Sequence, residues 1–279
     1  MRGSKHRNNP AGFSGGREWL ASGLAIGALG LLAGFIAVPL LSLVVWTVNE
    51  EAWSAVASPV AIEALSLSMR TTAATMVILV VVGTPAAYVL ARGSFRGSRA
   101  LNTLVELPIV LPPSAAGIAL LLAFGRFGFV GEYLNAFGIT LSFTTVAVVM
   151  AEVFVAAPFY VRQAATGFAA VDRTIEEAAL VDGADRTAAF LRVTSPLAFP
   201  ALVAGAVTAW ARALGEFGAT IIFAGNLRGV TQTIPLAIYS EFQSNIDAAV
   251  TLSVLVVGFA FAVILTVRYL TRRAVEYRD

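Results

Sequence analysis

Cysteine is absent from the 279 residues, and histidine occurs once, as His6 in a polar N-terminal segment. The sequence therefore offers no disulfide framework, no thiolate metal site and no histidine placed for acid–base catalysis. Charge is scarce too: acidic and basic residues make up 13% of the chain, whereas about a quarter is usual in a soluble domain. The net charge of +2 is spread over short loops rather than one face, so we expect no nucleic-acid partner.

Apolar residues make up 58% of the sequence and gather in runs long enough to cross a bilayer. An open strand leaves backbone groups unsatisfied in lipid, so each run is expected to be a helix. We predict an all-α integral membrane protein with one transmembrane domain over residues 19–270, between polar tails at 1–18 and 271–279. The six expected spans are residues 19–49, 71–91, 107–124, 143–161, 197–224 and 248–267.

Basic residues indicate the orientation, because cytoplasmic loops retain Lys and Arg. With a cytoplasmic N-terminus, the inner segments hold 15 of the 19 basic residues and the outer segments hold three, Arg70, Arg126 and Arg228. This bias predicts that both termini and the central loop are cytoplasmic. The outer segments then include residues 50–63 and 225–247.

The longest water-compatible run in the second half of the chain is EAALVDGADRTAAFLRVTSP, residues 177–196. Its start favours a short helix, because carboxylates lie at the positive end of the helix dipole and alanine has the highest helix propensity. Gly183 can then end the helix by adopting a positive φ. We expect a firm knob that a soluble partner pushes, formed by Glu176, Glu177, Ala178, Ala179, Asp182, Gly183 and Ala184.

The spacing of Glu177-Ala178-Ala179, Gly183 and Pro196 resembles the coupling-loop signature of ABC importer permeases. That pattern ends in Ile, any residue, Leu and Pro, so Val193 and Ser195 are departures. The resemblance implies the type I ABC importer permease fold, with a coupling loop over residues 166–196. An ordinary amphipathic loop helix is the alternative reading of these residues.

Arg212 and Glu216 in the fifth span are four residues apart, which places them on one helix face. A lone charge in hydrocarbon costs about 3 kcal/mol, so the pair should face protein or water. Two interpretations remain open: a structural ion pair, or the border of a substrate path or gate that includes Gly218 and Thr220.

Glu152 in the fourth span, six residues before Pro158, poses a related question. A carboxylate there is paired, neutral or part of a proton relay. Because a relay needs a chain of ionisable groups and Arg212 is the one plausible cation, we favour a paired or neutral Glu152.

The outer segment from Gly225 to Pro235 is polar and glycine-bearing. It is either a turn-rich connector or a docking surface for an external substrate-binding protein. For the second reading the candidate residues are Asn226, Arg228, Thr231 and Thr233.

Three stretches narrow the resemblance: Glu106 to Pro113, Arg212 to Thr220 and Asn226 to Pro235. These stretches resemble those of molybdate/tungstate permeases, and the similarity covers about residues 65–270. Sulfate permeases are the next most similar group. The resemblance implies a homodimer in a prokaryotic plasma (inner) membrane, two cytoplasmic ATPase subunits that bind ATP and Mg, and an external binding protein. The chain has no Gly-x-x-x-x-Gly-Lys-[Ser/Thr] phosphate loop, so we expect that it cannot hydrolyse ATP alone. We also expect no catalytic residue, no metal and no cofactor in this chain. The alternatives are a sulfate permease and an ATP-independent carrier or channel.

Overall fold

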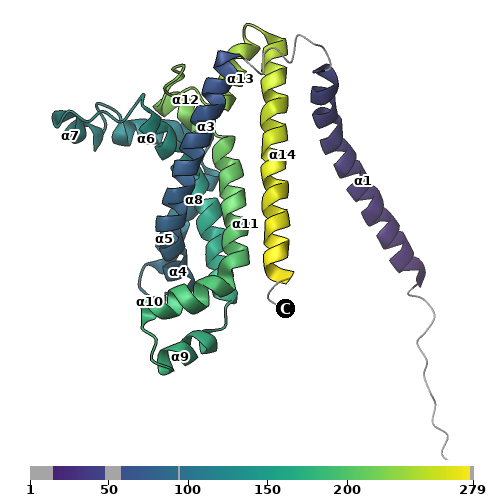
Figure 1. Cartoon of the computed structure of the whole chain (residues 1–279), viewed down its shortest axis with the longest axis vertical. Coiled ribbons are helices and arrows are strands. Elements are labelled where there is room, and N and C mark those ends of the chain that lie inside the picture. The colour runs from purple at the N-terminus through teal and green to yellow at the C-terminus, as the bar shows by residue number, and fades with distance from the viewer. Residues whose placement is uncertain (1–14, 48–57, 94, 277–279) are drawn as a thin grey trace, which may run out of the picture. The chain divides into compact units, whose positions relative to one another are not determined.

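The computed structural model describes residues 15–47, 58–93 and 95–276, and every regular element in these ranges is a helix (Figure 1). The chain divides into two compact units, residues 1–49 and residues 50–279. In the described ranges five helices are long and apolar enough to cross a membrane. They are Gly23–Trp46, Pro59–Arg92, Thr145–Ala170, Arg186–Leu214 and Ile246–Val267. The number of candidate spans is six if the bent helix pair Ser98–Val110 and Pro113–Phe124, which lies between the second and third of these helices, counts as one span.

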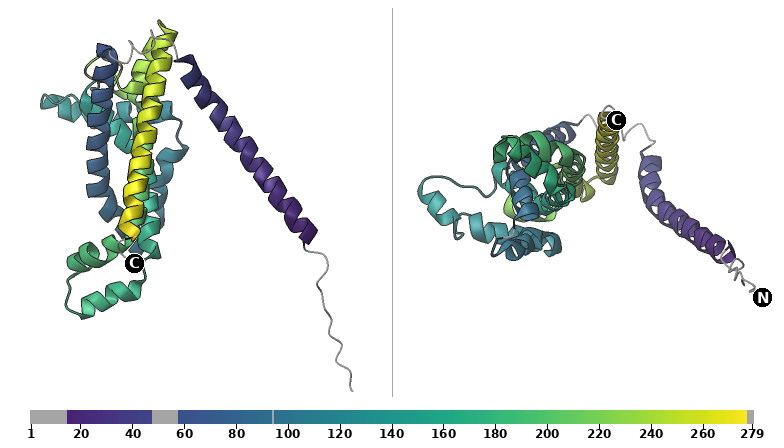
Figure 2. Two further views of the ribbon diagram at one scale, coloured as in Figure 1. Left: turned by 45° about the vertical axis from the view of Figure 1, so that its right-hand side comes forward. Right: turned by 90° about the horizontal axis from the view of Figure 1, so that it is seen from below.

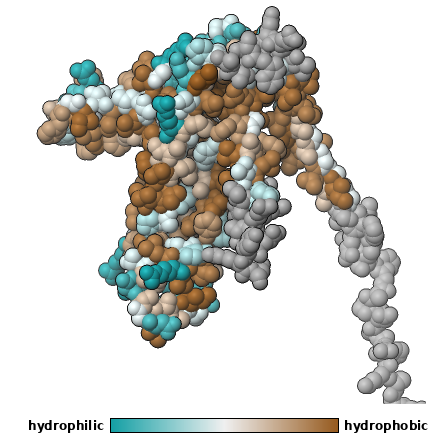
Figure 3. Space-filling model, viewed as in Figure 1, coloured by the Kyte–Doolittle hydropathy of each residue, from teal (hydrophilic) through white to brown (hydrophobic). Residues whose placement is uncertain are grey.

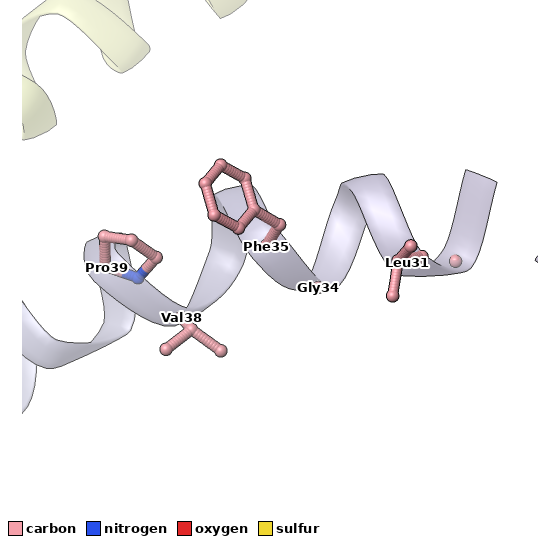
Figure 4. A pocket seen from close by; sticks show the side chains of 6 residues that line it. Leu31, Gly34, Phe35, Val38 and Pro39 are labelled. Atoms are coloured by element: carbon pink, nitrogen blue, oxygen red, sulfur yellow. The ribbon is translucent and has the colours of Figure 1, made fainter. Parts of the chain in front are cut away.

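The first unit holds α1 (Gly15–Trp46), which begins inside the segment predicted to be a polar tail. Residues 1–14 of that segment lie outside the described residues. Apolar side chains of α1 are widely exposed, for example Leu31 at 80% and Phe35 at 76%, as expected of a helix that meets lipid or other protein. A shallow depression on one face (Figure 4) is lined by Gly30, Leu31, Gly34, Phe35, Val38 and Pro39.

The second unit begins with a long span made of α3 (Pro59–Ile78), a π-helical turn η1 (Leu79–Gly83) and α4 (Thr84–Arg92). Its start is encoded locally: the Ser58 hydroxyl accepts the Ala61 N–H at 3.2 Å, and Pro59 occupies the first helical position. The helix therefore starts well before Thr71, the predicted start of the second span. Residues 59–63, expected in a polar outer segment, form its first turns.

The predicted third span, residues 107–124, is not one straight helix. The chain bends by 118° between helices α5 (Ser98–Val110) and α6 (Pro113–Phe124). Leu111 and Pro112 between them are extended, because a residue before proline is pushed out of the helical region. Pro108 lies inside α5 rather than at a helix start. A short helix, α7 (Gly131–Ala136), follows α6.

Helix α8 (Thr145–Ala170) lies at the centre of the second unit. Thr144 caps its start by accepting the Ala147 N–H. Tyr160 and Phe168 of α8 are almost wholly buried, and their cluster includes residues of α4 and α11 (Ser195–Leu214). The core is rich in alanine, which lets these helices pack closely.

The second half departs from the sequence prediction in three places. The predicted fifth span, residues 197–224, is split: α11 ends at Leu214, and α12 (Gly218–Phe223) follows after a short break. The outer segment 225–247 contains a helix, α13 (Ile234–Phe242). The last helix, α14 (Ile246–Glu276), runs into the segment 271–279 that was predicted to be a tail.

Within the second unit, α9 (Arg173–Val181) and α10 (Arg186–Ala189) lie at one end of the long helices, and α13 lies at the other (Figures 1 and 2). Polar residues gather over α9 and α10, while apolar residues cover much of the flanks of the long helices (Figure 3). This distribution fits a bilayer around the flanks and water at the α9–α10 end.

Candidate functional site

The predicted knob is a capped helix with a glycine stop. The Thr174 backbone N–H bonds the Asp172 carboxylate at 2.9 Å, and this bond lowers the pKa of that carboxyl group. After α9, Gly183 adopts φ +93°. Its N–H bonds Leu180 O, and the next N–H, of Ala184, bonds Ala179 O, which is the Schellman pattern. The expectation of a short helix ended by Gly183 is confirmed.

The knob has two sides. Glu177, Ala178, Asp182 and Gly183 are exposed, whereas Glu176, Ala179 and Ala184 are half-buried. The exposed surface also carries apolar side chains that the sequence analysis did not single out: Ile175, Leu180 and Val181, of which Val181 is 86% exposed. Apolar groups exposed on a water-facing helix indicate a protein contact.

Glu176 turns toward the transmembrane helices. Its carboxylate accepts a hydrogen bond from the Tyr88 hydroxyl of α4 and lies 3.4 Å from Nη2 of Arg92. The same Arg92 nitrogen donates to Val171 O at 2.9 Å, just before the Asp172 cap. Neither Tyr88 nor Arg92 was singled out from the sequence, since both are more than 80 residues before Glu176.

Arg212 and Glu216 form an ion pair, with Arg212 Nη2 2.7 Å from Glu216 Oε2. The prediction that they share one helix face needs correction, because α11 ends at Leu214 and Glu216 lies in the break before α12. The second oxygen of Glu216 accepts the Ala219 N–H at 2.7 Å and so caps α12. Glu216 is buried and Arg212 is partly exposed.

The other two residues assigned to a path or gate lie on α12. Gly218 begins this helix close against Pro113 of α6, and Thr220 is fully buried. Helix α12 packs on α6 and α8 through a cluster that includes Phe223 and Leu120. Of the four predicted residues, Arg212 and Gly218 are partly exposed, whereas Glu216 and Thr220 are buried.

Glu152 is buried and is paired through hydroxyl groups. Thr71 Oγ1 donates to one of its carboxylate oxygens at 2.7 Å and Thr75 Oγ1 to the other at 2.8 Å. The expected pairing is present, although the donors come from α3 rather than from Arg212. A sequence signal existed: Ser68, Thr71, Thr72 and Thr75 recur at helical spacing in α3, and all four are buried.

The predicted docking loop is folded largely on itself. Thr231 Oγ1 accepts the Leu227 N–H at 2.9 Å, and Asn226 Nδ2 donates to Ser240 Oγ of α13 at 2.8 Å. Thr231 and Thr233 are buried, so their hydroxyls do not line an open face of this chain. Arg228 remains exposed and pairs with Glu63 Oε2 at 3.0 Å.

Among the described residues, no cluster of three or more acidic, histidine or cysteine side chains is arranged to hold a metal ion. Two features of the described residues suit the transmission of movement. Helix α9 is capped and exposed, and the carboxylate of Glu176 connects it to α4.

Residues 80–278 match the family described as "Binding-protein-dependent transport system inner membrane component". The chain is 46% identical to the molybdenum transport system permease protein ModB of Mycobacterium tuberculosis, over 84% of this chain and 88% of that protein. It is 37% identical to ModB of Escherichia coli K12 over 75% and 93% of the two chains. It is 34% identical to the molybdate/tungstate transport system permease protein WtpB of Thermococcus kodakarensis, over 88% of this chain and 94% of that protein.

The fold is similar to that of a bacterial ABC transporter involved in the import of the acidic polysaccharide alginate. The TM-score is 0.73 at 17% identity, over 92% of this chain and 96% of that chain. A second structure of an alginate ABC transporter, in complex with a periplasmic protein bound to an alginate pentasaccharide, gives a TM-score of 0.71. The chain belongs to the binding-protein-dependent inner membrane components, the permease subunits of ABC importers.

Proposed function

We propose that this chain is the permease subunit of an ATP-driven importer of molybdate or tungstate in a prokaryotic plasma membrane. The observation that carries this proposal is the 46% identity, over 235 residues, to a molybdenum transport permease. The similarity to the molybdate/tungstate permease of Thermococcus kodakarensis, at 34% identity over 88% of this chain, supports the same substrate class.

The working unit is a homodimer of this chain with two cytoplasmic ATPase subunits and an external binding protein. ATP and Mg are held by the ATPase subunits, since this chain has no phosphate loop of its own. Helix α9 is the contact with the ATPase: Glu177 and Asp182 offer carboxylates, and Val181 offers an exposed apolar side chain. Closure of the ATPases around ATP draws the two α9 helices together and switches the path between inward- and outward-facing.

Uptake of molybdate into proteoliposomes tests which anion the complex transports. The complete complex, supplied with its binding protein and internal ATP, should accumulate radioactive molybdate, and unlabelled tungstate should compete. Sulfate in the same excess should compete far less. Competition by sulfate as strong as that by tungstate would make this a general oxyanion or sulfate permease, and uptake without ATP would contradict the coupling itself.

Co-purification tests the contact at α9. A Glu177→Lys variant reverses a charge on the exposed side and should lose the ATPase subunit from the purified complex. A Glu132→Lys variant makes the same change on α7, away from the knob, and serves as the matched control. Normal ATPase recovery and stimulation with Glu177→Lys would show that the ATPase docks elsewhere.

A further inference from the structure

Tyr88 touches three elements that meet at the α9–α10 end. Its ring packs edge-on against Phe168 of α8, with centroids 5.5 Å apart, and against Phe190, 4.8 Å away, in the π-helical turn η2 (Phe190–Thr194) that leads into α11. Its hydroxyl donates to Glu176 of α9. One side chain of α4 therefore contacts the helices before and after the loop as well as α9 itself.

Arg92 adds a second connection one turn further along α4. Its Nη2 lies 3.4 Å from Glu176 and donates to Val171 O at 2.9 Å, so it holds both α9 and the segment that enters it. The side chains of Arg92 and Glu176 are only 13% and 17% exposed. Water screens such a pair far less than one on an open surface, and the hydrogen bond that Tyr88 donates to the same carboxylate is of the stronger, charge-assisted kind.

The side-chain hydrogen bonds and ion pairs that join α9 to a spanning helix, in the described part of the chain, all end on Glu176. Elsewhere α9 is attached through short connections, Val171–Asp172 before it and Asp182–Asp185 after it, and it packs against α10 and η2. If a displacement of α9 only bent these connections, α4 would not be displaced with it. The carboxylate of Glu176 ties α9 itself to α4, and Arg92 also holds Val171 of the entering connection.

We propose that Tyr88, Arg92 and Glu176 form a latch that makes the α3–α4 span move together with the coupling helix. The two neighbouring glutamates then have different tasks: Glu177 faces the ATPase, and Glu176 faces the membrane helices. The latch rests on the proposed function, since it transmits a movement that the ATPase supplies. Tyr88, Arg92 and Glu176 are positioning residues, because none of them contacts the transported anion in this account.

The span that is moved has a route to the centre of the unit. Helix α3 carries the threonines that bind Glu152 of α8, and Ser68 of α3 accepts the Ile234 N–H at the start of α13. A displacement of α4 is thus passed along a continuous helix to residues at the opposite end. The latch would link movement at the ATPase side to the external side through α3 as well as through α11.

The first experiment separates transmission from assembly. Complexes with Tyr88→Phe, with Glu176→Gln or with the parent sequence are reconstituted with the ATPase and binding protein. Recovery of the ATPase and basal ATP hydrolysis should stay near parent values in Tyr88→Phe, because that substitution lies on α4 and leaves every residue of α9 unchanged. Molybdate imported per ATP hydrolysed should fall about fivefold or more, the smallest effect usual for coupling between sites.

Tyr88→Phe is the decisive variant, because it removes one oxygen and leaves the ring cluster with Phe168 and Phe190 in place. Tyr133→Phe on exposed α7 is its matched control and should leave transport per ATP unchanged. Parent transport per ATP in both Tyr88→Phe and Glu176→Gln would overturn the latch. Failure of the parent complex to use ATP at all would instead overturn the proposed function.

The second experiment measures the movement directly and uses the absence of native cysteine. Val89→Cys on α4 and Thr174→Cys on α9, both at exposed positions, accept spin labels for a distance measurement. With the latch intact, the distance between the labels should be the same with and without ATP and Mg. In Glu176→Gln the distance should shift or broaden on ATP addition. A shift of equal size in the parent would show that α4 and α9 move independently.

Discussion

Arg212 Nη2 lies 2.7 Å from Glu216 Oε2 across the point where α11 ends, and the other oxygen of Glu216 caps α12. One buried carboxylate thus holds two helices in register. Removing its cation leaves a buried charge without compensation, which typically costs about 3–5 kcal/mol. We therefore expect Arg212→Leu to lower the thermal unfolding temperature of the purified permease markedly.

A second substitution should restore much of that stability. In the double variant Arg212→Leu, Glu216→Gln, the side chain at 216 is neutral and its oxygen can still accept the Ala219 N–H. Equal instability of the single and double variants would mean that the charge is not what matters. A double variant that folds normally yet imports no molybdate would favour the path interpretation over the purely structural one.

Glu152 and its two threonines give a prediction of the same kind in α3 and α8. Thr71→Val and Thr75→Val together leave both carboxylate oxygens without a donor, and each loss costs about 1–3 kcal/mol, more if the group is charged. Adding Glu152→Leu removes the unsatisfied group and should raise the unfolding temperature above that of the double threonine variant. A triple variant no more stable than the double would contradict a role for these hydrogen bonds.

Gly183 stands at φ +93° with open space around the position of a Cβ, so a substitution there is costly only through the backbone. An alanine should cost about 1 kcal/mol and an asparagine less. Hydrogen exchange should show faster opening of residues 173–184 in Gly183→Ala, with the global unfolding temperature nearly unchanged. Gly215→Ala, at φ −86°, is the control that should show no such opening.

The features that the sequence predicted correctly depend on neighbouring residues. The stop at Gly183 acts within one turn, so the end of α9 could be found without a structure; the Asp172 cap is equally local but was not predicted. The α5–α6 break was also encoded locally, in Leu111-Pro112-Pro113. It was missed because residues 107–124 were expected to form one span, whereas Pro113 begins α6 and Leu111 and Pro112 separate it from α5.

The contacts that could not be predicted from the sequence depend on packing between segments far apart in the chain. Thr71 lies 81 residues from Glu152, and Tyr88 lies 88 residues from Glu176, so no local pattern joins them. The presence of α13 was open to prediction, because Pro235 stands in its first turn, where proline is favoured. Burial of Thr231 and Thr233 could not be predicted from the sequence, because it depends on how the loop folds against α13 and α3.

A close approach of α8 and α11 at Gly167 gives the last prediction. A Cβ on Gly167 would collide with the Cβ of Ala201, so the two helices meet at a distance that only glycine permits on the α8 side. Gly167→Ala should therefore cost about 1–3 kcal/mol through overpacking, seen as a lower unfolding temperature.

Ala201→Gly removes the atom that Gly167→Ala would strike, so the pair of substitutions should recover much of the lost stability. Gly258→Ala is the control, because α14 offers it open space and alanine favours a helix. Since α8 leads into the coupling loop and α11 leads out of it, forcing the two apart should also lower transport per ATP. Parent stability and transport in Gly167→Ala would mean that the α8–α11 contact yields easily and does not fix the geometry of the loop.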